Sequence, residues 1–108
     1  MHGSTQTLLF KTLADPTRRA LFERLVREGE LTVSALTQRA GVSQPAVSQH
    51  LDALKRAGLV RNRREGRIAR YRATPRGLAP LTNWLAVYAV FWRERFDRLE
   101  KLLKEMDQ

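Results

Sequence analysis

Side chains that can recognise nucleic acid bases are concentrated in one short stretch of the chain, from Ser43 to Gly58. At about 100° per residue, a helix over this stretch has an apolar side and a polar side. Ser and Gln both donate and accept hydrogen bonds, which suits the edges of base pairs in a DNA major groove. An ordinary surface helix has the same polarity, so the neighbouring segments must decide between the two interpretations. The residues expected to read bases are Ser43, Gln44, Pro45, Ser48 and Gln49.

The ends of this stretch predict a helix over residues 44–57. Ser43 is a suitable N-cap, because its hydroxyl can accept a free backbone N–H of the first turn. Pro45 lies in that first turn, where a missing N–H costs little, and Gly58 can adopt the left-handed conformation that ends a helix. The side expected to be buried contains Val47, His50, Leu51, Leu54 and Ala57.

A shorter helix is predicted just before this one. Thr32 is its expected N-cap, Val33 and Leu36 have helical spacing, and Gly41 closes it. Two short helices joined by a glycine-containing turn form the helix-turn-helix pattern, whose second helix enters the groove. Two earlier helices are expected on either side of Asp15, because the residue before a proline avoids the helical region. Asp15 is the expected N-cap of the second of these helices, with Pro16 at its first position.

Residues 60–73 predict a strongly basic β-hairpin that turns around Glu65 and Gly66. Glu65 is the only acid between Lys55 and Arg76. A basic face can simply be solvated, but a hairpin so charged directly after a helix-turn-helix favours contact with phosphates. The residues expected to contact phosphates are Lys55, Arg63, Arg64, Arg67 and Arg70.

The composition limits the class of protein. Lys and Arg total 20 against 11 Asp and Glu, and the net charge of +9 indicates a nucleic acid or an acidic membrane surface as partner. The absence of cysteine excludes disulfides and thiolate chemistry. Residues 1–9 lack signal-peptide features, and the longest apolar run is about half of the ~20 residues that cross a bilayer. We expect a single domain over residues 1–108 in the cytoplasm, at the nucleoid when its partner is DNA, without membrane contact.

The last segment, from Pro80 to Met106, predicts a long helix that needs a partner. Five of the eight aromatic residues lie between Trp84 and Phe96, so the first half is apolar nearly all round and must be buried on more than one side. A small domain can cover one of those sides, which predicts a homodimer. The expected interface residues are Leu9, Phe10, Leu13, Leu81, Trp84, Leu85, Tyr88, Phe91, Trp92, Leu99 and Leu102.

Four blocks in this order resemble the ArsR/SmtB family of bacterial transcription repressors: Leu13–Arg19, Leu31–Leu36, Ser43–Leu51 and Ala57–Val60. The resemblance covers nearly the whole chain. It implies a mainly α (α+β) winged helix-turn-helix with about five helices and a two-stranded hairpin wing. It also implies dimerisation through the first and last helices and binding to operator DNA.

Differences from the metal-sensing members indicate the non-metal branch of that family, which includes autorepressors. Thr32 and Ser34 stand where arsenic- and cadmium-sensing members have cysteines. The last helix offers Glu94 and Asp97 but no histidine, whereas zinc-sensing members use Asp and His there. His2 and His50 are the only histidines. We therefore expect no metal site and no cofactor, and the residues identify no inducing ligand.

A homodimeric repressor bound to double-stranded palindromic DNA is the leading interpretation. RNA binding is disfavoured, because the basic stretch contains one aromatic residue, Tyr71, and sequence-specific RNA binders stack bases on several. No enzyme is expected: His50 and Asp52 point different ways on a helix, and no set of nucleophile, base and orienting group is visible. A protein-interaction module that acts through its last helix is the remaining alternative, and it predicts unchanged DNA binding when Gln44 and Gln49 are both replaced by Ala.

Overall fold

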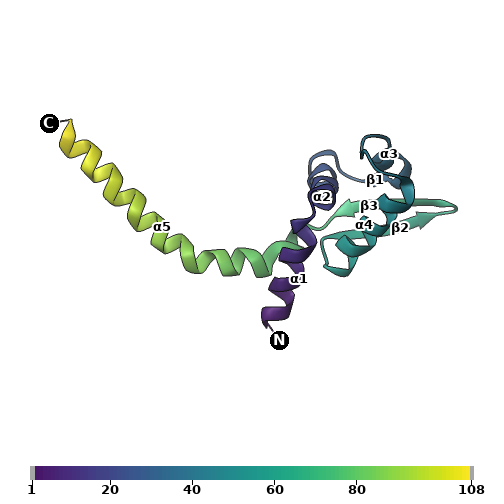
Figure 1. Cartoon of the computed structure of the whole chain (residues 1–108), viewed down its shortest axis with the longest axis horizontal. Coiled ribbons are helices and arrows are strands. Elements are labelled where there is room, and N and C mark those ends of the chain that lie inside the picture. Colours follow the sequence, from purple (N-terminus) through teal and green to yellow (C-terminus); the bar gives the residue numbers. More distant parts are fainter. Residues whose placement is uncertain (1, 108) are drawn as a thin grey trace.

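The computed structural model describes the backbone of residues 2–107 and the side chains of residues 5–107. It confirms a mainly helical winged helix-turn-helix fold (Figure 1). The elements are α1 (His2–Ala14), α2 (Pro16–Glu28), β1 (Leu31–Thr32), α3 (Val33–Gln38), α4 (Gln44–Arg56), β2 (Val60–Glu65), β3 (Ile68–Ala73), the 3-10 turn η1 (Pro75–Leu78) and α5 (Ala79–Met106).

Side-chain caps fix where three of the helices begin, as predicted. The Asp15 carboxylate accepts the backbone N–H of Arg18 at 3.0 Å, and this bond lowers the pKa of Asp15 below its ordinary value. Thr32 Oγ1 accepts the N–H of Ala35 at 3.0 Å at the start of α3. Ser43 caps α4 in the same way. Because each cap uses a first-turn N–H that the helix itself leaves free, the turns between α1, α2, α3 and α4 are sharply defined.

The predicted hairpin is one part of a three-stranded antiparallel sheet with the order β1-β3-β2. Strand β1 is an addition that the sequence does not predict, because two residues are too few to show an alternating pattern. Its Leu31 and Thr32 pair with Tyr71 and Arg70. The turn between β2 and β3 begins at Gly66, whose φ of 60° is a conformation that glycine adopts without strain.

The core lies between the helices and one face of the sheet. Within α4, Val47, Leu51 and Leu54 are fully buried, as the pattern predicts. Leu9 of α1 is only 1% exposed and packs into the core of its own chain. The buried apolar residues are Leu9, Leu21, Phe22, Leu25, Leu36, Val47, Leu51, Leu54, Leu59, Val60 and Tyr71.

The end of α4, the base of the hairpin and the start of α5 meet at a backbone contact. Leu59 N–H donates to the carbonyl of Leu54 at 2.9 Å, and Thr74 N–H donates to the carbonyl of Leu59 at 2.8 Å. A Cβ on Gly77 would overlap the carbonyl oxygen of Gly58. Only glycine at position 77 therefore allows η1 to approach the end of α4 so closely.

Helix α5 projects away from the remainder of the fold, on the side opposite the hairpin (Figure 1). Its 28 residues span about 42 Å. The radius of gyration is 18.9 Å, against about 13 Å for a compact domain of this length. Phe10 on α1 packs edge-to-face with Trp84 of α5, with ring centroids 5.3 Å apart, so α1 holds the first part of α5.

No helix in residues 2–107 combines the length and hydropathy that a membrane-spanning segment needs.

Candidate nucleic-acid interface

Helix α4 presents the predicted reading side chains on its outer side. Gln44, Pro45 and Gln49 are exposed, and Ser48 is half-buried. Ser43 is exposed as well, but its hydroxyl accepts the N–H of Ala46 at 3.3 Å and so has the additional role of a cap. Since the opposite side of α4 is fixed in the core, these polar groups are held on a rigid helix.

A hollow of about 320 Å³ lies between the start of α4 and the hairpin. Gln44 and Ser48 line it from α4, and Arg64 and Arg67 line it from the hairpin. It therefore combines amide and hydroxyl groups that can recognise bases with guanidinium groups that can bind phosphates. Its complete lining is Thr32, Val33, Ser34, Gln44, Ser48, Arg64, Arg67, Ile68 and Ala69.

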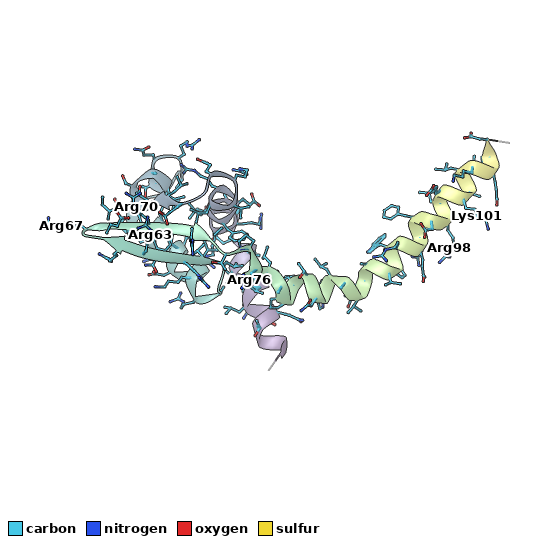
Figure 2. All side chains as sticks on the ribbon, turned by 180° about the vertical axis from the view of Figure 1, so that it is seen from behind. Arg63, Arg67, Arg70, Arg76, Arg98 and Lys101 are labelled. Carbon is cyan, nitrogen blue, oxygen red and sulfur yellow. The ribbon has the colours of Figure 1, made fainter. Side chains whose placement is uncertain are left out.

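The four hairpin arginines expected to contact phosphates lie on two different faces. Arg64 pairs with Ala69 in the register, whereas Arg63 pairs with Arg70. Because successive residues of a strand point to opposite sides, Arg63 and Arg70 lie on the face that does not border the hollow. Figure 2 shows Arg67 at the tip of the hairpin, with Arg63 and Arg70 along its strands.

The guanidinium group of Arg63 is hydrogen-bonded to two carboxylates. Its Nε and Nη2 donate to the two oxygens of Glu30 at 3.0 and 2.8 Å, and its Nη1 donates to Glu65. The bonds to Glu30 and then Glu65 raise the pKa of Arg63, and the guanidinium lowers the pKa of Glu30. The donors of Arg63 are therefore used by bonds within the protein, although about half of the side chain is exposed.

The two remaining polar residues of α4 singled out above are Lys55 and His50. Lys55, which is predicted to contact phosphates, is exposed in the last turn of the helix. His50 is half-buried on the inner side of α4, where the Nε of Arg18 donates to its Nδ1 at 3.4 Å. This bond joins α2 to the recognition helix. Among the side chains of residues 5–107, no three His, Cys, Asp or Glu are grouped closely enough to hold a metal ion.

The residues predicted for the dimer interface divide into buried and exposed groups. Leu9 is buried in its own chain and has no surface to offer to a partner, because the inner side of α1 packs on the core. Leu13 and Leu81 also pack against the core and are partly buried. The remaining eight are between 37% and 56% exposed: Phe10, Trp84, Leu85, Tyr88, Phe91, Trp92, Leu99 and Leu102.

Some residues of these surfaces are absent from the predicted set. Ser34 of α3 lines the hollow, and nothing in the sequence pattern distinguishes it from other polar residues. Arg61 and Arg72 face each other in the register of β2 and β3. The alternating pattern of the hairpin could have predicted that they lie on the same face as Arg63 and Arg70. The exposed apolar side chains of α5 that were not predicted as interface are Val87, Val90, Phe96, Leu103 and Met106.

Comparisons with known proteins agree with this geometry. Residues 13–63 match a family model described as a helix-turn-helix domain. The chain is 44% identical over 71 residues to the arsenic resistance transcriptional regulator ArsR1 of Pseudomonas putida, covering 66% of this chain but only 56% of that relative. It is 42% identical over 83 residues to the biofilm growth-associated repressor of Xylella fastidiosa, covering 77% and 70% of the two chains. The crystal structure of an ArsR family transcriptional regulator matches with a TM-score of 0.75 and 31% identity, over 84% of this chain and 93% of the other.

Proposed function

Because the chain belongs to the ArsR/SmtB family of winged helix-turn-helix transcriptional regulators, we propose that it is a homodimeric repressor that binds a palindromic operator in double-stranded DNA. One observation carries the proposal: amide and hydroxyl side chains suited to base edges and arginines suited to phosphates line a single hollow between α4 and the hairpin. Such a regulator acts in the bacterial cytoplasm, where the operator DNA is.

In this proposal the start of α4 enters the major groove. Gln44 and Ser48 contact base edges there, since residues near the start of a recognition helix are those that reach them. Arg64 and Arg67 contact phosphates beside the same groove. Lys55 contacts a phosphate from the far end of α4, while Ser43 and Pro45 hold the start of the helix and Gln49 extends its reading surface.

The partner proposed for α5 is a second copy of the chain. Trp84, Tyr88 and Trp92 are 37%, 45% and 56% exposed on one helix, and a contiguous apolar surface of this kind is unusual on a monomer. Burial of aromatic side chains stabilises an interface at about 25 cal/mol per Å². A two-fold axis between the α5 helices places two recognition helices about 34–36 Å apart, one turn of DNA.

We place the protein in the non-metal branch of the family. The name of the Pseudomonas relative refers to arsenic resistance, but this chain has no cysteine with which to bind arsenic or another thiophilic metal. Thr32, which stands where a metal-sensing member has a cysteine, uses its hydroxyl to cap α3.

Selection from a pool of random duplexes, followed by sequencing, tests the proposal and identifies the operator in the same experiment. We expect enrichment of an imperfect palindrome whose half-site centres are about 10–10.5 base pairs apart. Absence of any enriched motif would contradict a sequence-specific regulator. A single unpaired half-site would contradict the dimer alone.

The selected duplex then tests the role of α4. Gln44→Ala is expected to weaken binding by about 1–3 kcal/mol and to relax the preference at one base position. Gln38→Ala is the matched control, because Gln38 is exposed at the end of α3 and does not line the hollow. If both variants bind with unchanged affinity and preference, Gln44 is not a reading residue.

A further inference from the structure

A second arginine-lined hollow, of about 250 Å³, lies at the base of the hairpin. Arg61 of β2, Arg72 of β3 and Arg76 of η1 line it, together with Ala73, Thr74 and Pro75. Arg61 and Arg72 are two residues away from Arg63 and Arg70 along their strands, so all four share the face of the sheet that points away from the α4 hollow. Figure 2 shows Arg76 where the hairpin meets α5, well separated from Arg67 at the tip.

The charges in this hollow are not balanced by the protein. Within the described residues, no ion pair includes Arg61, Arg72 or Arg76. Arg61 and Arg72 also line an adjoining hollow that contains Glu30, and, after Arg63, Arg72 helps to lower the pKa of that carboxylate. Both oxygens of Glu30 are hydrogen-bonded to Arg63, however, so this one acid cannot balance three further arginines. Arg61 and Arg72 also stand directly opposite each other on paired strands, and like charges in that arrangement are destabilising.

A polar group without a partner lies in the same lining. Thr74 Oγ1 is buried and makes no hydrogen bond with the protein, although the backbone N–H of Thr74 is bonded to Leu59. A buried hydroxyl without a partner is costly. Three arginines and one threonine whose hydroxyl has no partner in the protein thus line one cavity, and no carboxylate lines it.

We propose that this hollow at the base of the wing binds a phosphate group. The planar guanidinium fork matches phosphate oxygens and can donate two parallel hydrogen bonds. Three arginines suit a phosphate dianion better than a single carboxylate, which would leave two positive charges unbalanced. The volume is below the 300–1,000 Å³ that is typical of pockets for complete small molecules, so the hollow has room for the phosphate while the remainder of its molecule stays outside. The phosphate belongs either to a small molecule or to the DNA backbone.

Titration of the DNA-free protein with inorganic phosphate at constant ionic strength tests the site. Side-chain N–H resonances of the arginines, followed by NMR, report the binding. We expect saturable shifts for Arg61, Arg72 and Arg76, but not for Arg98. Arg72→Ala should weaken phosphate binding by about tenfold and the isosteric Thr74→Val by roughly fivefold. Arg98→Ala, at an exposed position of α5 far from the hairpin, is the control and should bind phosphate as the wild type does.

Uniform, non-saturating shifts of all exposed arginines would overturn the proposal, and so would unchanged phosphate affinity in both Arg72→Ala and Thr74→Val. Where binding is observed, the salt dependence of DNA affinity in phosphate-free buffer identifies the source. Arg72→Ala lowers the salt slope if the site holds a DNA phosphate, and leaves it unchanged if the site takes a small molecule. The titration without DNA does not depend on the proposed repressor function, so the two can fail separately.

Discussion

Arg63 and Arg64 are neighbours on β2 that point to opposite faces of the sheet, which makes them a matched pair for a test of DNA contact. Arg64 lines the hollow beside Gln44, whereas Arg63 is bonded to Glu30 and Glu65. We predict that Arg64→Ala removes one phosphate contact from each protomer. Each contact contributes about 0.9 to the slope of log affinity against log salt concentration, so the slope of a dimer should fall by about 1.8.

This change in slope has a measurable consequence for affinity. Between about 50 and about 200 mM salt, a slope difference of about 1.8 corresponds to about 12-fold. The loss caused by Arg64→Ala should therefore be about 12-fold larger at the low salt concentration than at the high one. Fluorescence anisotropy with a labelled duplex, for both the selected operator and random DNA, measures it at several salt concentrations.

Arg63→Ala should leave the salt slope unchanged, because no phosphate contact is lost. Arg64→Lys should retain most of the slope, since a lysine still provides one positive charge. An equal fall in slope for Arg63→Ala and Arg64→Ala would refute our assignment of the two faces. A loss on the operator alone, with random DNA unaffected, would mean that Arg64 reads sequence.

Four further predictions concern the dimer, the core, metals and pH. Trp92→Glu should split the dimer in analytical ultracentrifugation, because it would bury an unpaired charge in the proposed interface; a dimer that persists would exclude Trp92 from it. Leu51→Ala, at a fully buried position, should lower the free energy of unfolding in urea by about 2–5 kcal/mol, and a negligible change would contradict the packing of α4. Zn(II), Cd(II) and As(III) at stoichiometric concentration should not release the protein from DNA, and release that a chelator reverses would argue for a metal site. The pKa of Asp15 is lower in the folded chain, so its stabilising contribution is complete above the ordinary value of 3.8 and is lost as pH falls through the lower folded value; Asp15→Asn should flatten that acid dependence of the melting temperature.

Local chemistry was sufficient to predict much of this fold. Ser43, Thr32 and Asp15 act as caps because their short polar side chains can reach a first-turn N–H, and this depends on only a few consecutive residues. The buried side of α4 followed from helical spacing alone. These are properties of one segment at a time.

Features that depend on contacts between distant segments could not be predicted in the same way. Strand β1 exists because Leu31 and Thr32 meet β3, some forty residues later, and two residues carry no pattern of their own. Leu9 was predicted to lie in the dimer interface because it belongs to the apolar side of an amphipathic helix. Only the tertiary packing shows that this side is covered by the core of the same chain. The sequence predicts Arg63 as a free cation, but Glu30, which is 33 residues away in the sequence, binds its guanidinium group.

Mechanically, α5 is a lever arm of about 42 Å whose fulcrum lies at the contact between Gly58 and Gly77. A tilt of about 5° at Ala79 moves the far end of such an arm by about 4 Å. In the proposed dimer, the same tilt would change the distance between the two recognition helices and therefore their phase along the DNA. At this contact the backbone of Gly77 packs directly on the backbone of Gly58. No side chain lies between the two glycines that could change rotamer and absorb the tilt. In the proposed dimer, this pair of glycines, together with the contact between Phe10 and Trp84, would set how stiffly one recognition helix is held relative to the other.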